Sequence, residues 1–215
     1  MDNYKLIVRA SACSQLMTND RTGKQMGDTA KGLIKSIAVA DVFGLRPQFS
    51  SKETEKGHWM EQDAIELLNR LEFQSYQKNM TRVTWEGFTG ECDIHAPEQS
   101  LIRDIKCAWS ASTFSWTTDE LEAKAKKAGY DIQGRVYMML YKCDYFKLDE
   151  VLLTTPSDLL KFDDEDFHSV DHIAENKRIT TIAFERDAEF EERLFERYQQ
   201  AEKFYNEYIN QLLNK

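Results

Sequence analysis

Proline and glycine are scarce in this chain, which contains only 3 prolines and 9 glycines among its 215 residues. This scarcity excludes collagen-like and Pro/Gly-rich disordered proteins, because such chains are built on those two residue types. Hydrophobic residues make up 41% of the chain and aromatic residues 12%, which is enough to form a buried core. A chain of this length is therefore expected to form one folded domain of ordinary size.

Long apolar runs are missing as well. No stretch approaches the roughly 18–20 apolar residues that a membrane-spanning helix needs. The opening residues, Met-Asp-Asn-Tyr-Lys-Leu-Ile-Val-Arg, lack the apolar segment of a signal peptide. None of the four cysteines belongs to a Cys-x-x-Cys pair, so they do not predict a zinc or iron–sulfur site. We therefore expect a cytoplasmic protein with reduced thiols and no membrane partner.

An excess of positive charge is also absent, since the net charge of the chain is −9. Residues 144–215 contain 18 acidic and 9 basic residues, whereas residues 1–143 contain 19 of each. Contacts to a nucleic acid backbone need local rather than global positive charge. The first 36 residues, with 6 basic and 3 acidic residues, could supply it together with Lys124, Lys126 and Lys127. An ordinary mixed surface is the alternative.

Two short strand-like runs carry acidic residues in an otherwise mostly apolar setting. They are Gly-Glu-Cys-Asp-Ile-His-Ala at 90–96 and Ser-Leu-Ile-Arg-Asp-Ile-Lys-Cys-Ala at 100–108. Because side chains alternate between the two faces of a strand, Asp104 and Lys106 are expected to point the same way and Ile105 the other way. Charges on strands are costly to bury, so these residues are candidates for function.

A hairpin with its turn at Pro97-Glu98-Gln99 would place Asp93 beside Asp104. Two adjacent carboxylates are hard oxygen ligands suited to Mg²⁺. An acid followed by any residue and a lysine is not specific, because it recurs at 122–124 and 175–177. Only at 104–106 does an apolar strand lead into it beside a second acid. The alternative is that the two aspartates are edge-strand charges that prevent aggregation.

Two further polar residues flank these runs. Glu61 lies near the start of an amphipathic helix predicted over 57–71, where it could reach a metal directly or through water. It could instead only complement the helix dipole. Gln133 heads an apolar stripe in the helix predicted near 131–141. A glutamine on the sheet side of a helix must be hydrogen-bonded, and at a catalytic edge it is suited to bind substrate.

Periodicity, caps and turn residues predict the remaining elements. We expect strands at 4–9, 81–86, 145–155 and 179–185, helices at 11–18, 27–43, 58–72, 118–128, 130–142 and 187–214, a polar connector at 50–57 and an acidic loop at 163–166. Trp109 and Trp116 bracket an aromatic, small-polar segment directly after Lys106. They could line a DNA channel and stack on a base, or they could be core residues.

In their order and spacing these features resemble the PD-(D/E)XK nuclease superfamily, and within it the lambda-exonuclease-like (YqaJ-like) phage recombination nucleases. The matching positions are Gly57, Glu61, Asp93, Asp104, Lys106 and Gln133. Near the N-terminus, Arg9-Ala10-Ser11 and the segment Ser14-Gln15-Leu16-Met17 are similar to the family's opening strand-to-helix segment. The resemblance covers roughly residues 8–155. It departs from the family at Asp104, where many members have glutamate.

The resemblance implies a mixed α/β (α+β) fold with a restriction-endonuclease-like core, in which helices flank a central mixed β-sheet. It implies a single nuclease domain over 1–215, with a core at about 50–155. A helical segment at 1–49 would precede that core. An acidic strand and long helix at 156–215, for which the family offers no matched counterpart, would follow it.

The resemblance also assigns metal ligands. Asp93 and Asp104 would bind Mg²⁺ or Mn²⁺ together with the backbone carbonyl of Ile105. Glu61 would hold a second ion or its water, which makes two ions per site. Metal at this point lowers the pKa of a bound water and neutralises phosphate charge.

The remaining site residues follow from the same resemblance. Lys106 would orient or help deprotonate the attacking water, which a lysine can do when its surroundings depress its pKa. Gln133 would position the water or the phosphate. Ser11 and Arg9 would contact DNA phosphate.

The function implied is a Mg²⁺-dependent exonuclease that resects double-stranded DNA 5′ to 3′ and leaves 5′-phosphate products, in phage or prophage recombination within a bacterial host cell. The family implies a homo-oligomeric ring, commonly a trimer, and a single-strand annealing protein as partner. Three alternatives stay open at this point. They are a restriction- or repair-type endonuclease on the same core, a catalytically inactive nucleic-acid-binding module, and an interaction protein whose acidic C-terminal third mimics DNA.

Overall fold

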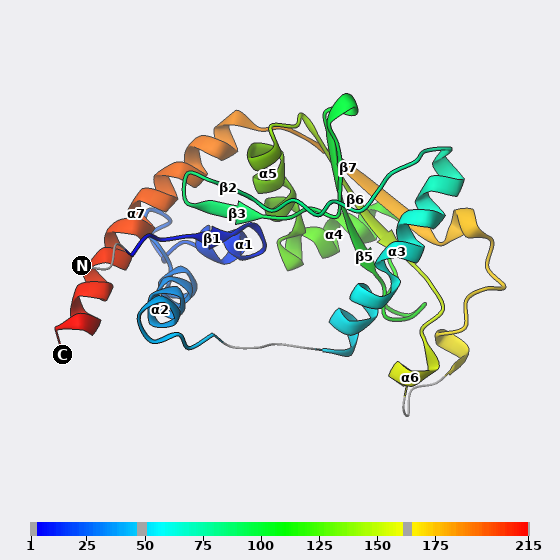
Figure 1. The fold of residues 1–215 in the computed structure, drawn as a ribbon, viewed down its shortest axis with the longest axis horizontal. Helices are drawn as coiled ribbons and strands as arrows, with labels where there is room; N and C mark the ends of the chain where they lie inside the picture. The colour runs from blue at the N-terminus through cyan, green and yellow to red at the C-terminus, as the bar shows by residue number, and fades with distance from the viewer. Residues whose placement is uncertain (1–3, 47–50, 161–164, 215) are drawn as a thin grey trace.

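The computed structural model describes residues 4–46, 51–160 and 165–214 (Figure 1). The strands are β1 (Val8–Arg9), β2 (Val83–Trp85), β3 (Phe88–Gly90), β4 (Ile94–Ala96), β5 (Leu101–Cys107), β6 (Tyr145–Val151) and β7 (Ile179–Glu185). The α-helices are α1 (Cys13–Leu16), α2 (Asp28–Phe43), α3 (Lys52–Glu72), α4 (Thr118–Ala128), α5 (Tyr130–Tyr141), α6 (Ser157–Leu160) and α7 (Ala188–Leu213). Short 3₁₀ turns are η1 (Ala10–Ala12), η2 (Pro97–Gln99), η3 (Glu165–Phe167) and η4 (Glu175–Lys177).

The strands form two sheets. A four-stranded sheet has the order β4-β5-β6-β7, in which β5 and β6 are parallel and the two outer pairs are antiparallel. A three-stranded sheet has the order β1-β3-β2, with β1 parallel to β3. Helices lie on both sides of the larger sheet (Figure 1). The expected mixed sheet flanked by helices is therefore confirmed.

The two faces of the larger sheet belong to different hydrophobic clusters. Ile105 packs with the apolar residues of α3, whereas Ile102 joins the main core with α5. Because side chains alternate along β5, Asp104 and Lys106 share one face, as predicted, and the structure places that face on the α5 side. At Gly134 in α5, a Cβ atom would overlap the ring of Phe146 on β6. The absence of a side chain at Gly134 therefore lets α5 approach the sheet closely.

The first and last helices share the main core. α7 packs along α2, and in Figure 1 it runs beside the N-terminal elements. The hydroxyl of Tyr198 in α7 donates to the carbonyl of Leu6 at 2.8 Å, and Tyr205 donates to Asp41 of α2 at 2.7 Å. Within the residues that the structure describes, no helix is both long and apolar enough to span a membrane.

Several predicted boundaries are wrong. The connector expected at 50–57 is helical from Lys52, because Ser51 caps α3 by accepting the Thr54 N–H at 3.3 Å. The run at 90–96 is not one strand, since β3 ends at Gly90 and the chain then crosses to the other sheet before β4. The helix expected at 11–18 is the turn η1 followed by α1, and the strands expected at 4–9 and 145–155 are shorter. Residues 163–164 of the acidic loop and residue 50 of the connector lie outside the described residues.

Candidate active site

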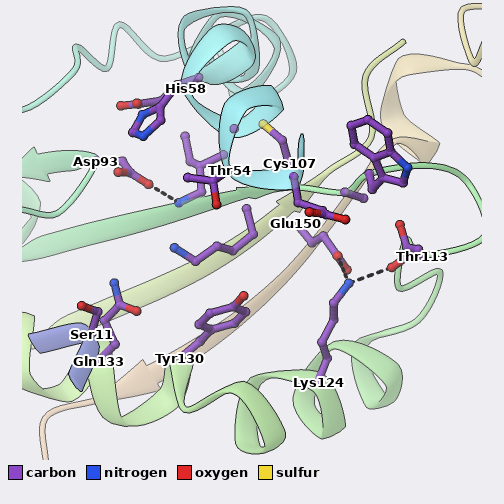
Figure 2. A pocket seen from close by; sticks show the side chains of 17 residues that line it. Ser11, Thr54, His58, Asp93, Cys107, Thr113, Lys124, Tyr130, Gln133 and Glu150 are labelled. Atoms are coloured by element: carbon purple, nitrogen blue, oxygen red, sulfur yellow. Dashed lines mark hydrogen bonds and ion pairs between the residues drawn. The ribbon is translucent and has the colours of Figure 1, made fainter. Parts of the chain in front are cut away.

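A cavity of about 630 Å³ lies where α3, the β4–β5 hairpin, α4, α5 and β6 meet. In Figure 2, His58 and Asp93 lie toward one end of the cavity, and Glu150, Lys124 and Thr113 toward the other. Its lining contains both carboxylates, among them Asp93 and Glu150, and the lysines Lys106 and Lys124. Such a lining is suited to a ligand that carries both phosphate and metal charge.

The two aspartates of the hairpin face each other. Ile94 on β4 pairs with Arg103 on β5 in antiparallel register, so Asp93, one residue before Ile94, lies opposite Asp104. The Oδ2 atom of Asp93 accepts the backbone N–H of Ile105 at 2.5 Å. The hairpin thus holds one carboxylate against the backbone of the strand that carries the other.

Asp104 is paired with Lys106. The Nζ atom of Lys106 lies 2.5 Å from Oδ2 of Asp104, whose side chain is only 3% exposed. That buried oxygen makes no hydrogen bond, so the ion pair is what offsets its charge. Burial lowers the pKa of Lys106, but the charges of Asp104 and Asp93 outweigh burial and raise this pKa above its ordinary value. Lys106 is therefore protonated beside these two aspartates.

Burial, and then the neighbouring charge of Asp104, raise the pKa of Asp93 to about 8. Both effects disfavour a second negative charge in the same place. A divalent cation would reverse them, because it stabilises both carboxylates at once. The buried Asp104 oxygen makes no hydrogen bond and has only the Lys106 ammonium beside it, and the two aspartates supply hard oxygen donors that fit Mg²⁺ or Mn²⁺. Ile105, whose carbonyl was the third expected ligand, lines the same cavity.

Glu61 lines the cavity from α3, but its carboxylate is held by another residue. The Nζ atom of Lys78 donates to Oε2 of Glu61 at 2.8 Å. Across the described part of the chain, no three His, Cys, Asp or Glu side chains are grouped closely enough to hold a metal ion between them. The structure thus brings together Asp93, Asp104 and Lys106, whereas Glu61 reaches the cavity without joining the aspartates as a ligand group.

Gln133 and Ser11 also line the cavity. Gln133 is buried in α5, and its Nε2 atom donates to the hydroxyl of Tyr137 at 2.8 Å. This hydrogen bond fixes the amide, so that its oxygen remains as an acceptor on the cavity side. Ser11 is exposed in η1 and lies with Gln133 in Figure 2.

The expected DNA-contacting residues divide into two groups. Trp109 lines the cavity, with its ring edge-on to His168 at 5.1 Å between ring centres. Arg9 is exposed on β1 outside the lining of the cavity. Trp116 also lies outside it, where its Nε1 atom donates to the carbonyl of Ala111 at 3.1 Å and its ring contacts Phe114. The structure therefore separates Trp116 and Arg9 from the acids.

A second buried acid was missed by sequence reasoning. Glu150 on β6 is adjacent to Lys106 in the parallel pairing and is 1% exposed. Its carboxylate accepts the N–H of Ser115 at 2.9 Å and is paired with Lys124. Lys124 also donates to the carbonyl of Thr113 at 2.7 Å. The available signal was an acidic pair inside the strand predicted at 145–155.

Lys56 is another residue that sequence reasoning missed. It is fully buried on α3, and its Nζ atom donates to three backbone carbonyls, those of Ala108, Trp109 and Leu153, and to the hydroxyl of Thr155, all within 3.0 Å. These bonds tie α3 to the chain that leaves β5 directly after Lys106. Lysines are mostly exposed, so a lysine in a polar stretch carries no sequence signal of such a role.

Comparisons with known proteins agree with this arrangement. The chain is similar to a phage-related exonuclease from Haemophilus somnus 129PT, known from its crystal structure, at 36% identity over 97% of both chains, with a TM-score of 0.92. It also shares its fold with an alkaline exonuclease from Laribacter hongkongensis, at 14% identity over 97% of this chain and 92% of the other, with a TM-score of 0.64. The complex of that exonuclease with dAMP gives a TM-score of 0.61 at 15% identity, over 96% and 91% of the two chains. No protein-family model matches the chain, and no curated protein is similar to it.

Proposed function

Because the chain belongs to the lambda-exonuclease-like family of PD-(D/E)XK nucleases, we propose that it is a Mg²⁺-dependent exodeoxyribonuclease. It degrades double-stranded DNA from its ends in the 5′ to 3′ direction and leaves 5′-phosphate products. The observation that carries this proposal is the group formed by Asp93, Asp104 and Lys106, of which Asp93 and Lys106 line a cavity of about 630 Å³.

The two aspartates would hold a divalent cation together with the carbonyl of Ile105, and Glu61 would serve a second one. The ions, Mg²⁺ or Mn²⁺, activate a water molecule and neutralise phosphate charge when bound. Such an ion would offset both effects that raise the pKa of Asp93, which are its burial and then the neighbouring charge of Asp104.

Lys106 acts on the attacking water. In the metal-free site its ammonium is held by Asp104. When the charge of Asp104 is taken up elsewhere, the pKa of Lys106 falls, because burial is then the largest remaining influence. The side chain can then orient the water and accept its proton.

The other lining residues position the DNA. Gln133 presents its amide oxygen to the water or the phosphate, because its Nε2 atom is already engaged by Tyr137. Ser11 donates its hydroxyl to a phosphate, and Trp109 stacks on a base beyond the scissile bond. Arg9 and Trp116 lie outside the cavity and would contact DNA only further along its path. The complex of the related exonuclease with dAMP supports a deoxynucleotide ligand.

The family supports the wider setting. We propose a homo-oligomer, a trimeric ring, that threads duplex DNA and works with a single-strand annealing protein in phage recombination in the cytoplasm of a bacterial host. Light scattering checks the assembly. A monomer that releases DNA after each cut would contradict the ring.

Digestion of matched DNA substrates tests the activity. Linear duplex DNA with 5′-phosphate ends, the same duplex with 5′-hydroxyl ends and closed circular DNA are incubated with Mg²⁺ and with EDTA. We expect loss of the linear forms only, in Mg²⁺ only, with mononucleotides that carry a 5′-phosphate. Cleavage of the circle would show a restriction- or repair-type endonuclease instead, and no cleavage with Mg²⁺ or Mn²⁺ would show a binding module.

A further inference from the structure

Each acid of the candidate metal site has its own counter-group on the protein. Asp104 is paired with Lys106 at 2.5 Å, Glu61 with Lys78 at 2.8 Å, and Asp93 with the N–H of Ile105. Two lysines therefore neutralise charge that a divalent cation would neutralise in the loaded site. A divalent cation bound to a carboxylate repels an ammonium held by the same carboxylate, so metal binding weakens these ion pairs.

The two lysines differ in their freedom to leave. Lys106 stands on the central strand β5, its side chain is 28% exposed, and its Nζ atom lies 5.0 Å from the ring centre of Tyr130. Lys78 lies before β2, where a single bridge to Ile94 joins it to the sheet, and its side chain is 41% exposed. A lysine side chain of this kind is a hydrated charge on a flexible stem. Lys78 is thus the counter-ion that can move.

The backbone places Lys78 next to the metal acids. Its bridge partner Ile94 directly follows Asp93, and the N–H of Asn79 donates to the carbonyl of Asp93 at 2.7 Å. Glu61, by contrast, belongs to α3 and is 15% exposed. The ion pair therefore joins α3 to the chain segment that carries Asp93, across the edge where the metal would bind.

We propose that Lys78 is a displaceable counter-ion of the metal site: Glu61 exchanges the Lys78 ammonium for a divalent cation, and the released ammonium binds a backbone phosphate of the DNA. The inference rests on the proposed function. It assigns to one residue two opposite effects, competition with metal in the free protein and attraction of DNA in the loaded protein. A merely structural ion pair has neither effect on ligand binding.

Calorimetric titration of the metal-free protein with Mn²⁺ tests the exchange. Lys78→Met removes the competing ammonium, so we expect it to bind Mn²⁺ about two- to fivefold more tightly than the wild type, the range that corresponds to a partly exposed ion pair. Arg70→Met is the matched control. It removes one charge and one ion pair, with Glu175 at 2.7 Å, from α3 at a different cavity, and it should leave Mn²⁺ affinity unchanged. Unchanged or weaker Mn²⁺ binding by Lys78→Met would overturn the proposal.

The salt dependence of DNA binding tests the second half. Fluorescence anisotropy is measured on a short duplex with Ca²⁺ in place of Mg²⁺, so that the DNA stays intact, and again in EDTA. With Ca²⁺, Lys78→Met should reduce the slope of log affinity against log salt by about one, as expected for the loss of one phosphate contact. In EDTA the two slopes should agree, because Lys78 is then held by Glu61. Lys78→Arg should restore the wild-type slope with Ca²⁺. Equal slopes for the wild type and Lys78→Met with Ca²⁺ would overturn the proposal, and so would a difference between their slopes that persists in EDTA.

The proposed function and this inference fail differently. If the wild-type protein shows no metal-dependent digestion, the proposed function is wrong. If the wild type digests DNA with Mg²⁺ while Lys78→Met matches it in Mn²⁺ affinity and salt slope, the nuclease assignment stands and the counter-ion role is wrong.

Discussion

A buried charge is tolerated only where a partner compensates it, and Asp104 shows this at the scale of one residue. Its side chain is 3% exposed. Its Oδ2 atom forms an ion pair with the Lys106 ammonium and makes no hydrogen bond. A hydrophobic residue would fill the same place on β5 without this cost. The charge is therefore best understood as part of a ligand site.

Substitutions of Asp104 and Lys106 should reduce DNA cleavage without unfolding the protein. Asp104→Asn keeps the shape of the side chain but removes the charge, so we expect cleavage to fall at least about a hundredfold while the circular dichroism spectrum stays that of the wild type. Lys106→Met should cost about a hundred- to ten-thousandfold for the loss of the group that acts on the water. Full Mg²⁺-dependent activity in both folded variants would contradict the assignment.

Lys56 gives a pH-dependent prediction. Burial lowers the pKa of Lys56 to about 8 from an ordinary value of 10.5. Between these values the unfolded chain binds more protons at this position than the folded protein does, so the stability contributed by Lys56 rises as pH increases from 8 to 10.5. The free energy of unfolding of the wild type and of Lys56→Met is measured by denaturant titration across this range. The wild-type value minus the Lys56→Met value should increase with pH. A constant difference would mean that the folded-state pKa is not lowered.

Candidate site residues could be predicted from the sequence where charged residues interrupt an otherwise apolar strand. Asp104 and Lys106 were found because β5 is otherwise apolar, and the turn at Pro97-Glu98-Gln99 set the register that brings Asp93 opposite. Lys78 was missed, because its role depends on a contact with Glu61 seventeen positions away that no local pattern encodes.

At the scale of elements, α3 is held at both ends by hydrogen bonds that involve charged side chains. Lys56 binds its N-terminal part to the chain after β5. At its C-terminal end, Glu72 accepts two hydrogen bonds from Arg103, a fully buried residue that also binds Asp149 with two bonds. Glu61 lies between these anchors, so its approach to the cavity is set by the helix as a rigid body.

The Arg103 cluster can be tested by removing one of its charges. Asp149→Asn leaves the buried guanidinium with Glu72 alone, so we expect a loss of about 3–5 kcal/mol in the free energy of unfolding, measured by urea denaturation. Glu175→Gln breaks the exposed pair with Arg70 and should cost less than about 1 kcal/mol. Similar losses in the two variants would show that the cluster is not the anchor.

Helices with a regular apolar periodicity and recognisable capping residues were predicted almost to the residue, whereas the start of α3 was not. The helix expected at 118–128 coincides with α4, because Thr117 and Glu120 form a capping box and Gly129 ends the helix. α3 begins six positions before the predicted 58, since its first turns are polar and have no apolar period. Tertiary contacts of Lys56 stabilise that turn, and periodicity alone does not contain them.

At the scale of the whole molecule, the core connects the first and last parts of the described chain. Leu194 and Tyr198 of α7 are buried with Val8 of β1 and Ala30 of α2. Arg197 donates to the carbonyl of Thr18 at 2.8 Å. α7 is thus a structural part of the unit that carries Ser11, although its polar face contributes to the acidity of the last third.

This shared core predicts cooperative unfolding. Leu194→Ala should lower the free energy of unfolding by about 2–5 kcal/mol, because Leu194 is fully buried. Leu213→Ala, at a leucine that is 54% exposed, should be nearly neutral. Far-ultraviolet dichroism and tryptophan fluorescence should report one and the same transition in each variant. Separate transitions would show that α7 and α2 unfold apart from the nuclease core.

The contact between α7 and the first twenty residues has a consequence for biosynthesis. A nascent chain still attached to the ribosome presents every acid of the candidate metal site before α7 has been made. Until then the hydroxyl of Tyr198 cannot reach Leu6, and the apolar face that covers Val8 is missing. The edge that carries Ser11 should therefore close only late in translation, which would keep an unfinished nuclease harmless to the genome of the cell that makes it.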